Sequence, residues 1–407
     1  MKKARRLVNI VTARYGGGTL SRVDANRHLF FPSTAQALER RQIQQQQSAA
    51  AAAKEEEEKA MPQKEDYGDV LPLPPSKLRF ESPPFDMGNT FEFLPFGGGG
   101  ARILCVNEAG GAILYDADAA TVKAMPSLRE SSRLVGLQLP ASFAVTHADP
   151  ARPGAFYVLD GVRHSFQALV YGDPTSSSTQ FPFCGELDTS PWRKWSMYSG
   201  RYAWHWRQLP PPPVHDDSDS SSSFQSYGDR DSRGYLQCYA LLNGNTICVS
   251  FLLPARAATY CFDTATGEWT KVGDWRLPFF SRALHVPELG DNLLFGIHGL
   301  SFCAIDVSGA MKNESAAPVL RHDWVDVDPT PPLEWNLHGQ SVAYLGAGRF
   351  CIHRAFDIKA QGGYGDWDTV DTVTMLTGVE VVREAGSSKL RLVKHKTKRV
   401  DYMDHLL

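Results

Sequence analysis

The histidine, glycine and serine residues of this chain are the first candidates for a metal-binding, phosphate-binding or catalytic site. Its twelve histidines could bind a metal ion, but pairs such as His285 with His298, or His395 with His405, lack the short spacing of a compact site. The run Gly97 to Gly100 lacks the Lys-Ser/Thr of a phosphate-binding loop, so it predicts a flexible strand connection. No Gly-x-Ser-x-Gly elbow or Cys-His constellation marks a nucleophile. We therefore assign no catalytic, cofactor-binding or metal-binding residue, although distant strands could still converge on one site.

The cysteines indicate a reducing compartment. There are seven, without a CxxC pair, and most lie in apolar, strand-like runs: Cys105, Cys184, Cys238, Cys248, Cys261, Cys303 and Cys351. This usage is typical of small buried hydrophobic side chains rather than of disulfides. The Asn313 glycosylation sequon is therefore expected to be idle.

Two basic segments could contact an acidic partner. Residues 192–207 interleave Trp and Tyr with Arg and Lys, as single-strand nucleic-acid binders do, but Trp204 and Trp206 could instead alternate onto one packed strand face. Residues 389–399 could direct nuclear import, or could form an outer strand protected by charge against edge-to-edge pairing. The strand-like alternation and the net charge of −3 favour the structural interpretation of both segments.

Several Asp and Trp residues recur at the ends and starts of apolar runs. An Asp at a strand end can accept hydrogen bonds from the amides of the following turn, so these carboxylates are predicted to stabilise turns rather than act as paired acids and bases. The residues predicted to have this structural role in turns and blades are Asp24, Asp116, Asp263, Trp269, Asp306 and Trp324.

The elements that carry these residues are repeated strand modules. An apolar strand ends in Asp, a short polar turn follows, and Trp or another apolar residue opens the next strand, most clearly in residues 260–269 and again in 114–122. Five such modules follow residue 78, and residues 5–31 form half a module. The pattern predicts an all-β fold, a single β-propeller of five or six four-stranded blades.

The domain organisation follows from this pattern and from two shifts in composition. Residues 1–34 are predicted to be closing strands that pair with the C-terminal module, the second strand running on to residue 31. Residues 35–76 carry Gln, Ala and Glu runs and are predicted to be a helical or disordered insertion. Residues 77–407 hold the blades, and the Asp/Ser-rich residues 214–234 are predicted to be a disordered loop.

Composition limits the partners and the location. A chain of 407 residues with 43% hydrophobic and 21% charged residues is typical of a globular protein, and its small net charge gives no general attraction to nucleic acid. No apolar run is long enough to span a membrane, and the basic start is not followed by the apolar core of a signal peptide. We expect a cytoplasmic or nuclear protein that is not secreted, is a monomer, and has a protein partner rather than a membrane or nucleic-acid partner.

The chain also resembles a known family. Residues 5–11, 22–24 and 27–34, the segment 204–213, the phrase 262–269 with 273–279, and residues 345–352 are similar to an uncharacterised family expanded in grasses, a domain of unknown function likened to kelch propellers. The similarity covers nearly the whole chain outside the two low-complexity segments. It implies a propeller fold, and it implies no activity, cofactor or site.

The leading functional hypothesis is a non-enzymatic protein-interaction module, a scaffold or adaptor that binds another protein through a loop-bearing face and needs no cofactor. Possible contact residues are Arg282, His285, Arg349 and His353. The first alternative is a hydrolase or oxidase with a site at the axial channel. The second is a nuclear regulator that uses the basic C-terminal strand.

Overall fold

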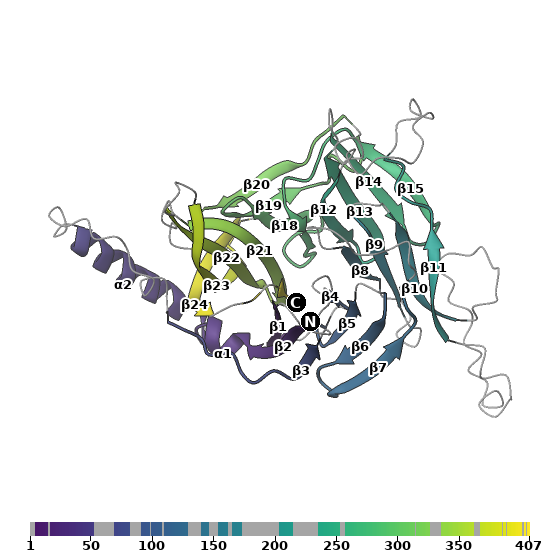
Figure 1. Cartoon of the computed structure of the whole chain (residues 1–407). Coiled ribbons are helices and arrows are strands. Elements are labelled where there is room, and N and C mark those ends of the chain that lie inside the picture. The colour runs from purple at the N-terminus through teal and green to yellow at the C-terminus, as the bar shows by residue number, and fades with distance from the viewer. Residues whose placement is uncertain are drawn as a thin grey trace, which may run out of the picture.

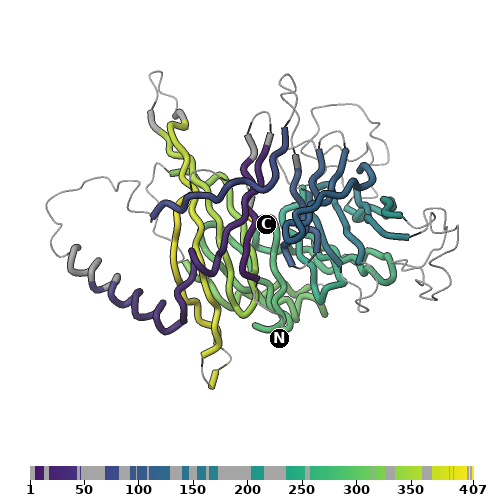
Figure 2. Tube along the Cα trace, turned by 90° about the horizontal axis from the view of Figure 1, so that it is seen from below, coloured from purple at the N-terminus to yellow at the C-terminus, as the bar shows by residue number. Residues whose placement is uncertain are grey.

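The computed structural model is a six-bladed β-propeller, a ring of six small sheets with antiparallel strand pairs (Figure 1). It describes residues 5–14, 17–52, 69–81, 91–97, 99–107, 110–128, 140–145, 154–161, 165–172, 203–214, 235–252, 257–313, 315–325, 335–361, 367–384, 386–387, 389–400, 403 and 405–407. Both ends of the chain lie near the centre of the ring (Figure 1). The view from below shows the sheets from the side, with their strands running next to one another (Figure 2).

The first three sheets in ring order are built from the two chain ends and the first half of the chain. The first sheet has the order β25 (His405–Leu406), β1 (Leu7–Arg14), β2 (Gly17–Asp24) and β3 (Leu78–Glu81). The second contains β4 (Phe91–Pro95), β5 (Arg102–Asn107), β6 (Ala112–Asp116) and β7 (Thr121–Met125). The third contains β8 (Ala141–Val145), β9 (Ala155–Leu159), β10 (Phe166–Gly172) and β11 (Ala203–Leu209).

The other three sheets follow in chain order. The fourth contains β12 (Tyr235–Leu242), β13 (Thr246–Leu252), β14 (Ala257–Asp263), β15 (Glu268–Gly273) and the short β16 (Ser281–Arg282). The fifth contains β17 (Leu284–His285), β18 (Leu293–His298), β19 (Ser301–Asp306) and β20 (Val319–Trp324). The sixth contains β21 (Trp335–Gly346), β22 (Arg349–Gln361), β23 (Trp367–Arg383) and β24 (Leu390–Val400).

Apolar seams between neighbouring sheets hold the ring together. In β13, Ile247 and Val249 pack toward the third sheet, whereas the intervening Cys248 packs toward the fifth. Because side chains of a strand alternate between its two faces, one apolar run can fill two seams at once. Within the described residues, an apolar cluster occupies each of the six contacts between neighbouring sheets. The ring therefore holds its innermost strands in fixed positions around the axis.

The strands at the two chain ends meet in the first sheet. β25 pairs antiparallel with β1, placing Leu406 opposite Ile10 and His405 opposite Val11. The sixth sheet is already complete with its own four strands, so the predicted pairing of the N-terminal strands with the C-terminal module is not confirmed. These strands instead form a separate blade that packs against the sixth sheet through an apolar cluster.

A helix replaces the predicted continuation of the second strand. β2 ends at Asp24, whose carboxylate accepts a hydrogen bond from the Arg27 amide (3.1 Å) and so caps α1 (Ala25–Leu29). The predicted strand over residues 28–31 is therefore wrong, because the N-cap side chain satisfies a helical amide instead of extending the ladder. α2 (Thr34–Ala52) follows, contacts β24, and projects away from the ring (Figures 1 and 2).

Some predicted segments lie outside the described residues. These are residues 53–68 of the insertion predicted at 35–76, residues 215–234 of the loop predicted at 214–234, and residues 192–202 of the aromatic and basic segment. The rest of that segment lies in β11, where Trp206 is buried and donates a hydrogen bond to the Pro126 carbonyl (2.9 Å).

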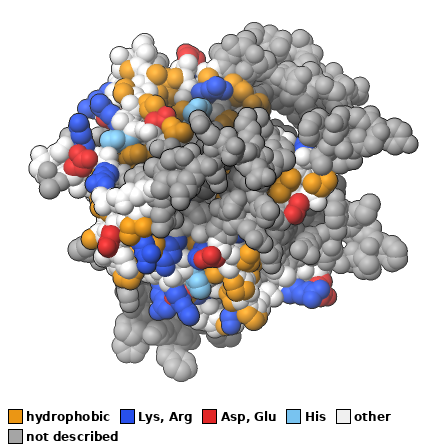
Figure 3. All heavy atoms as spheres, turned by 90° about the vertical axis from the view of Figure 1, so that its left-hand side faces the viewer, with side chains coloured by type: hydrophobic (Ala, Val, Ile, Leu, Met, Phe, Trp, Pro, Cys, Tyr) orange, Lys and Arg blue, Asp and Glu red, His pale blue; other side chains and the backbone are white. Residues whose placement is uncertain are grey.

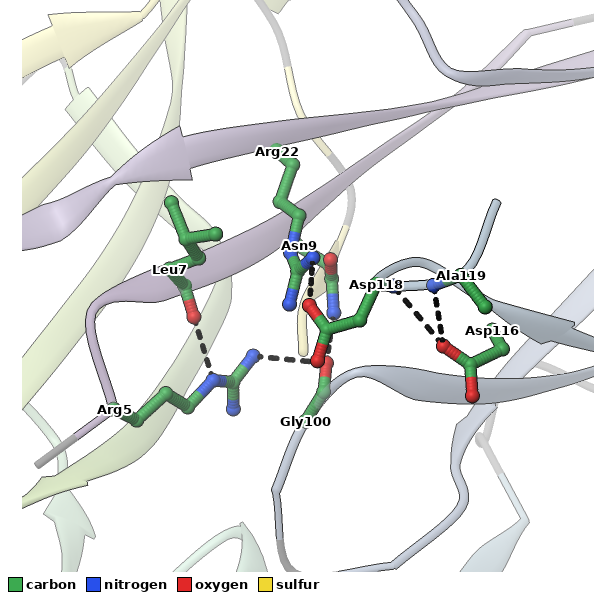
Figure 4. Close-up of polar contacts among 8 residues, drawn as sticks. All are labelled: Arg5, Leu7, Asn9, Arg22, Gly100, Asp116, Asp118 and Ala119. Carbon is green, nitrogen blue, oxygen red and sulfur yellow. Dashed lines mark hydrogen bonds and ion pairs between the residues drawn. The ribbon is translucent and has the colours of Figure 1, made fainter. Parts of the chain in front are cut away.

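The strand-end Asp residues contact the amides that follow them. Asp116 accepts hydrogen bonds from the amides of Asp118 (3.0 Å) and Ala119 (3.1 Å), as Figure 4 shows. Asp263 accepts one from the Ala265 amide (2.7 Å), and Asp306 one from the Ser308 amide (2.9 Å). These contacts shape the turns between neighbouring strands of a blade.

The two Trp residues of the pattern lie on outer strands. Trp269 packs on Phe262, with 5.1 Å between ring centroids, and donates to the Pro210 carbonyl. Trp324 stacks on Phe302, with 5.8 Å between centroids. Both rings therefore cover apolar residues of the neighbouring strand.

Candidate functional site

An axial cavity is the main candidate for a functional site. Its volume is about 280 Å³, and residues on or beside the innermost strand of every sheet line it. The polar and charged side chains among its lining residues are Arg5, Ser142, Tyr239, Ser281, Arg282, His285, Gln340, Ser341 and Tyr344. The ring thus brings together side chains from distant parts of the sequence, which is what a propeller axis offers a binding site.

A short extra strand supplies the exposed side of this cavity. β16 pairs parallel with the inner strand β12, setting Ser281 opposite Cys238 and Arg282 opposite Tyr239. Ser281 has a φ of 63°, a left-handed conformation that costs a non-glycine residue free energy. Phe280, Ser281 and Arg282 are all exposed and all line the cavity, so its mouth lies at this strand.

Arg5 lies deeper in the cavity and is held by main-chain oxygens. Its Nε donates to the Leu7 carbonyl (2.6 Å), and its Nη2 donates to the main-chain oxygens of Leu407 (2.5 Å) and Gly100 (3.5 Å). The guanidinium lies against Gly100, where a Cβ atom would come within 2.0 Å of Arg5 Cζ. Figure 4 shows Arg5 and Asn9 reaching the same Gly100 carbonyl.

Gly100 therefore has a specific role within the predicted glycine connection. Its φ of 65° and its close approach to Arg5 both require the absence of a side chain. The connection thereby holds the Arg5 guanidinium in place beside the cavity.

Two arginines line the cavity, and no Asp or Glu side chain is among the described residues that line it. Leu407, the last residue of this chain, also lines it, and its main-chain carboxylate lies against Arg5 and offsets the charge of that arginine. The pKa of Arg5 is lowered to about 10, first by burial and then by the positive charge of Arg22, with a further contribution from Arg282. The pKa of Tyr239 is raised, mainly by burial, so its phenol is neutral at physiological pH.

Glu92 precedes the cavity-lining residue Phe93 on β4. Burial raises its pKa to about 7, and its buried Oε2 has no hydrogen-bond partner among the described residues. Its charge also contributes to the raised pKa of Tyr239. Near neutral pH the Glu92 carboxyl is partly protonated.

The Glu92→Gln variant is expected to stabilise the protein at pH 8.5 by roughly 1 to 3 kcal/mol and to change little at pH 5. A raised acid pKa means that the folded state binds more protons than the unfolded state between the two pKa values. Stability is therefore lost as pH rises from about 4.5 through about 7. Urea unfolding at the two pH values measures the effect. Glu81→Gln, at an exposed carboxylate of β3, is the control, and equal effects of Glu92→Gln at both pH values would contradict the assignment.

Two further polar residues face the cavity from β21. Gln340 has a buried Oε1 without a hydrogen-bond partner among the described residues. Ser341 Oγ lies 3.1 Å from Nδ1 of His353, which is its cross-strand neighbour on β22. Gln340 therefore has an acceptor left for a ligand, and the hydroxyl of Ser341 is within hydrogen-bond distance of a histidine.

The structure separates the four residues predicted to make partner contacts. Arg282 and His285 line the cavity, and both ring nitrogens of His285 are engaged: Nδ1 accepts from the Asn243 amide, and Nε2 donates to the Asp291 carbonyl. Arg349 lies over the Phe30 ring (5.1 Å) and pairs with Glu380 (3.5 Å). His353 is buried. Only Arg282 combines exposure, charge and a place at the mouth.

Sequence reasoning did not identify Arg5, Tyr239, Gln340 or Phe280 as site residues. The N-terminal basic run contains Arg5, but its position depends on ring closure, which no local pattern reveals. One sequence feature could have pointed to residues 280–282: they lie between the strands expected for two neighbouring blades and belong to neither.

The possible metal ligands and the cysteines of the described part of the chain favour neither a metal site nor a reactive thiol. There, no three His, Cys, Asp or Glu side chains lie together in a way that could hold a metal ion. The six described cysteines are free and buried, and burial raises the pKa of Cys105 to about 12. Such thiols remain protonated and are poor nucleophiles. Cys184 lies outside the described residues.

The basic C-terminal segment forms β24, the last strand of the sixth sheet. Its lysines are partly engaged: Lys398 pairs with Asp69 (2.6 Å), and Lys396 lies over the Phe31 ring (4.9 Å). Figure 3 views this side of the molecule, where Lys and Arg side chains are spread among hydrophobic and acidic ones. No described helix is long and apolar enough to cross a membrane.

The fold and the cavity thus define a six-bladed propeller with an axial pocket that two arginines line. The chain belongs to the DUF1668 family, described as a protein of unknown function, whose model matches residues 5–400. This match does not test the kelch-like character or the grass expansion, which stay predictions. No curated protein matches the chain.

Solved structures give weaker similarities. One is a candidate 6-phosphogluconolactonase from Bacteroides fragilis, with 10% identity, a TM-score of 0.35, and coverage of 99% of this chain and 98% of that one. A protein from Lactobacillus plantarum has 11% identity, a TM-score of 0.32, and coverage of 74% and 85%. The Cps50 (Swd1) β-propeller domain of Myceliophteria thermophila has 10% identity, a TM-score of 0.28, and coverage of 56% of both chains.

Proposed function

We propose that this protein is a non-enzymatic binding module that docks a protein partner at the mouth of its axial cavity. The observation that supports it best is β16, which adds an exposed arginine and an exposed phenylalanine to the innermost edge of one blade. Arginine and aromatic side chains next to a pocket are the residues that dominate binding energy at protein interfaces.

The exposure of these two side chains favours binding over a purely structural role. Phe280 is 53% exposed, although buried aromatic side chains fill the seams of the ring. Arg282 has no ion-pair or hydrogen-bond partner among the described residues, whereas Arg6, Arg22 and Arg321 each pair with an Asp. An unpaired arginine beside an exposed aromatic ring is suited to a partner that carries an acidic and an apolar contact.

Quantitative affinity purification from extract of the native tissue tests this proposal. The full chain and its Arg282→Glu variant are compared with Arg391→Glu, which makes the same charge change at an exposed position of β24. We expect a set of proteins retained by the wild type and by Arg391→Glu, and reduced at least tenfold with Arg282→Glu. Equal recovery with all three proteins would contradict docking at the mouth.

A hydrolase is the second candidate, supported by the Ser341–His353 pair at 3.1 Å on the cavity wall. A serine hydroxyl hydrogen-bonded to an imidazole is the arrangement that activates a nucleophile. If the pair is active, a fluorophosphonate probe labels Ser341 of the full chain and fails to label the Ser341→Ala variant. Labelling that is absent, or that persists in this variant, would exclude Ser341 as a nucleophile.

A further inference from the structure

We infer that the axial cavity is an oxyanion site, in which Arg282 at the mouth and Arg5 at the base hold a carboxylate or phosphate group. The inference rests on the proposed function, because it names the chemistry that a partner would present at the mouth. The same chemistry could also come from a free small ligand.

Arg282 supplies the first contact. Its guanidinium has five N–H donors and no acceptor among the described residues, and the strand pairing with Tyr239 fixes its main chain. A planar guanidinium matches the two oxygens of a carboxylate or phosphate, which can bind it through two parallel hydrogen bonds. Its exposure allows an anion to approach from solvent.

Arg5 supplies a second, preorganised cation. Main-chain oxygens hold its Nε and Nη2, and no acceptor is found for Nη1 among the described residues. Because these bonds and Gly100 fix the guanidinium, binding an anion costs it little conformational entropy. Burial, and then the positive charge of Arg22, lower the pKa of this arginine. The Leu407 oxygen engages Nη2, so Nη1 is the group that Arg5 offers to an entering anion.

The remaining lining groups complete the site without opposing it. Gln340 can donate from its amide or accept at its unpartnered Oε1, while Ser281 and Tyr239 offer hydroxyl groups. No described lining residue has an acidic side chain, and the main-chain carboxylate of Leu407 is already engaged by Nη2 of Arg5. The arrangement therefore favours a ligand with an anionic group and a neighbouring polar group, such as an acidic side chain with its main-chain amide or a hydroxy acid.

The size of the cavity limits the ligand. A volume of about 280 Å³ lies just below the usual range for small-molecule pockets, so the cavity admits a small metabolite or a single amino-acid side chain. A folded domain or a nucleic-acid strand could only cover the mouth. The apolar part of the lining, including Phe93, Leu94 and Leu406, would contact the carbon skeleton of the ligand.

Isothermal titration calorimetry of the full chain tests the inference at constant ionic strength. The free ligands are inorganic phosphate and citrate, and the protein-borne group is represented by a capped Gly-Glu-Gly peptide beside its Gly-Gln-Gly counterpart. Arg282→Gln is compared with Arg391→Gln, which removes the same charge from an exposed position of β24.

We expect saturable 1:1 binding of at least one anion to the wild type and to Arg391→Gln, weakened at least tenfold in Arg282→Gln. Preference for phosphate or citrate would identify a free ligand, and preference for the Glu peptide over the Gln peptide would identify a protein-borne carboxylate. Absence of binding by all the anions, or equal binding by the two variants, would overturn the inference.

These results are separable from those for the proposed function. If partner recovery depends on Arg282 but no anion binds, the oxyanion site is wrong and the docking face stands. If anions bind through Arg282 but partner recovery is unchanged by Arg282→Glu, the site stands and docking at the mouth is wrong.

Discussion

Replacing Gly378 with alanine is expected to lower the free energy of unfolding by about 2 to 3 kcal/mol. Gly378 lies on β23, where α1 packs against the sixth sheet, and an added Cβ would come within 2.4 Å of the Leu29 main-chain oxygen. That neighbour is backbone and cannot rotate away, so α1 or the strand must shift. Urea unfolding measured by fluorescence gives the change.

Gly339→Ala is the matched control in the same sheet. Its added Cβ would meet Ala355 Cβ at 3.6 Å, an ordinary van der Waals distance. We expect this variant to stay within about 0.5 kcal/mol of the wild type. Equal effects of the two substitutions would show that α1 does not pack tightly against Gly378.

The Glu380→Gln variant is expected to cost about 2 kcal/mol at pH 7. Glu380 is 8% exposed; its Oε2 accepts a hydrogen bond from Thr34 (2.7 Å) and lies 3.2 Å from His395 Nε2. His395 in turn accepts a hydrogen bond from the Phe31 amide (3.1 Å) at Nδ1. This network ties the start of α2 to the sixth sheet, so its loss should loosen the helix as well as lower stability.

The cost of this substitution should shrink in acid. The hydrogen bond with His395, followed by those of Thr34 and the charge of Arg349, holds the pKa of Glu380 below its ordinary value of 4.5. A lowered acid pKa contributes stability above the unfolded value and loses it as pH falls through the folded value. Urea unfolding from pH 7 to pH 3 should show the wild type converging on the variant below about pH 4.5. Exposed Glu384→Gln is the control, and a pH-independent difference would contradict the network.

Much of the fold is predictable from local pattern. The phrase around Asp263 and Trp269 reveals a blade because strand alternation and turn chemistry both act over a few residues. The same reasoning gave a wrong prediction after Asp24. An Asp at the end of an apolar strand can begin either a turn or a helix, and here its carboxylate accepts a hydrogen bond from the Arg27 amide and caps a helix. The pairing of β1 with β25 joins residues almost 400 positions apart, such as Ile10 and Leu406, and local pattern does not encode it.

The candidate site is less predictable for the same reason. Arg282 could be named from its type, but Arg5 and Gln340 become neighbours only when six separate strands converge on one axis. Arg349 and His353 are residue types that are equally common at binding sites. In the structure, however, Arg349 packs over the Phe30 ring and His353 is buried. Residue type thus identified candidates, whereas three-dimensional position selected among them.

Site-specific photo-crosslinking tests the central claim, that partners dock at the cavity mouth, most directly. A photoreactive phenylalanine analogue replaces Phe280, which is 53% exposed at the mouth, or Val319, which is 52% exposed on the last strand of its sheet. Both proteins are irradiated in native extract, with and without Arg282→Glu. We predict a crosslinked partner from position 280 that disappears with Arg282→Glu and is absent from position 319. Equal crosslinking from both positions, or crosslinking at 280 that ignores Arg282, would contradict the account.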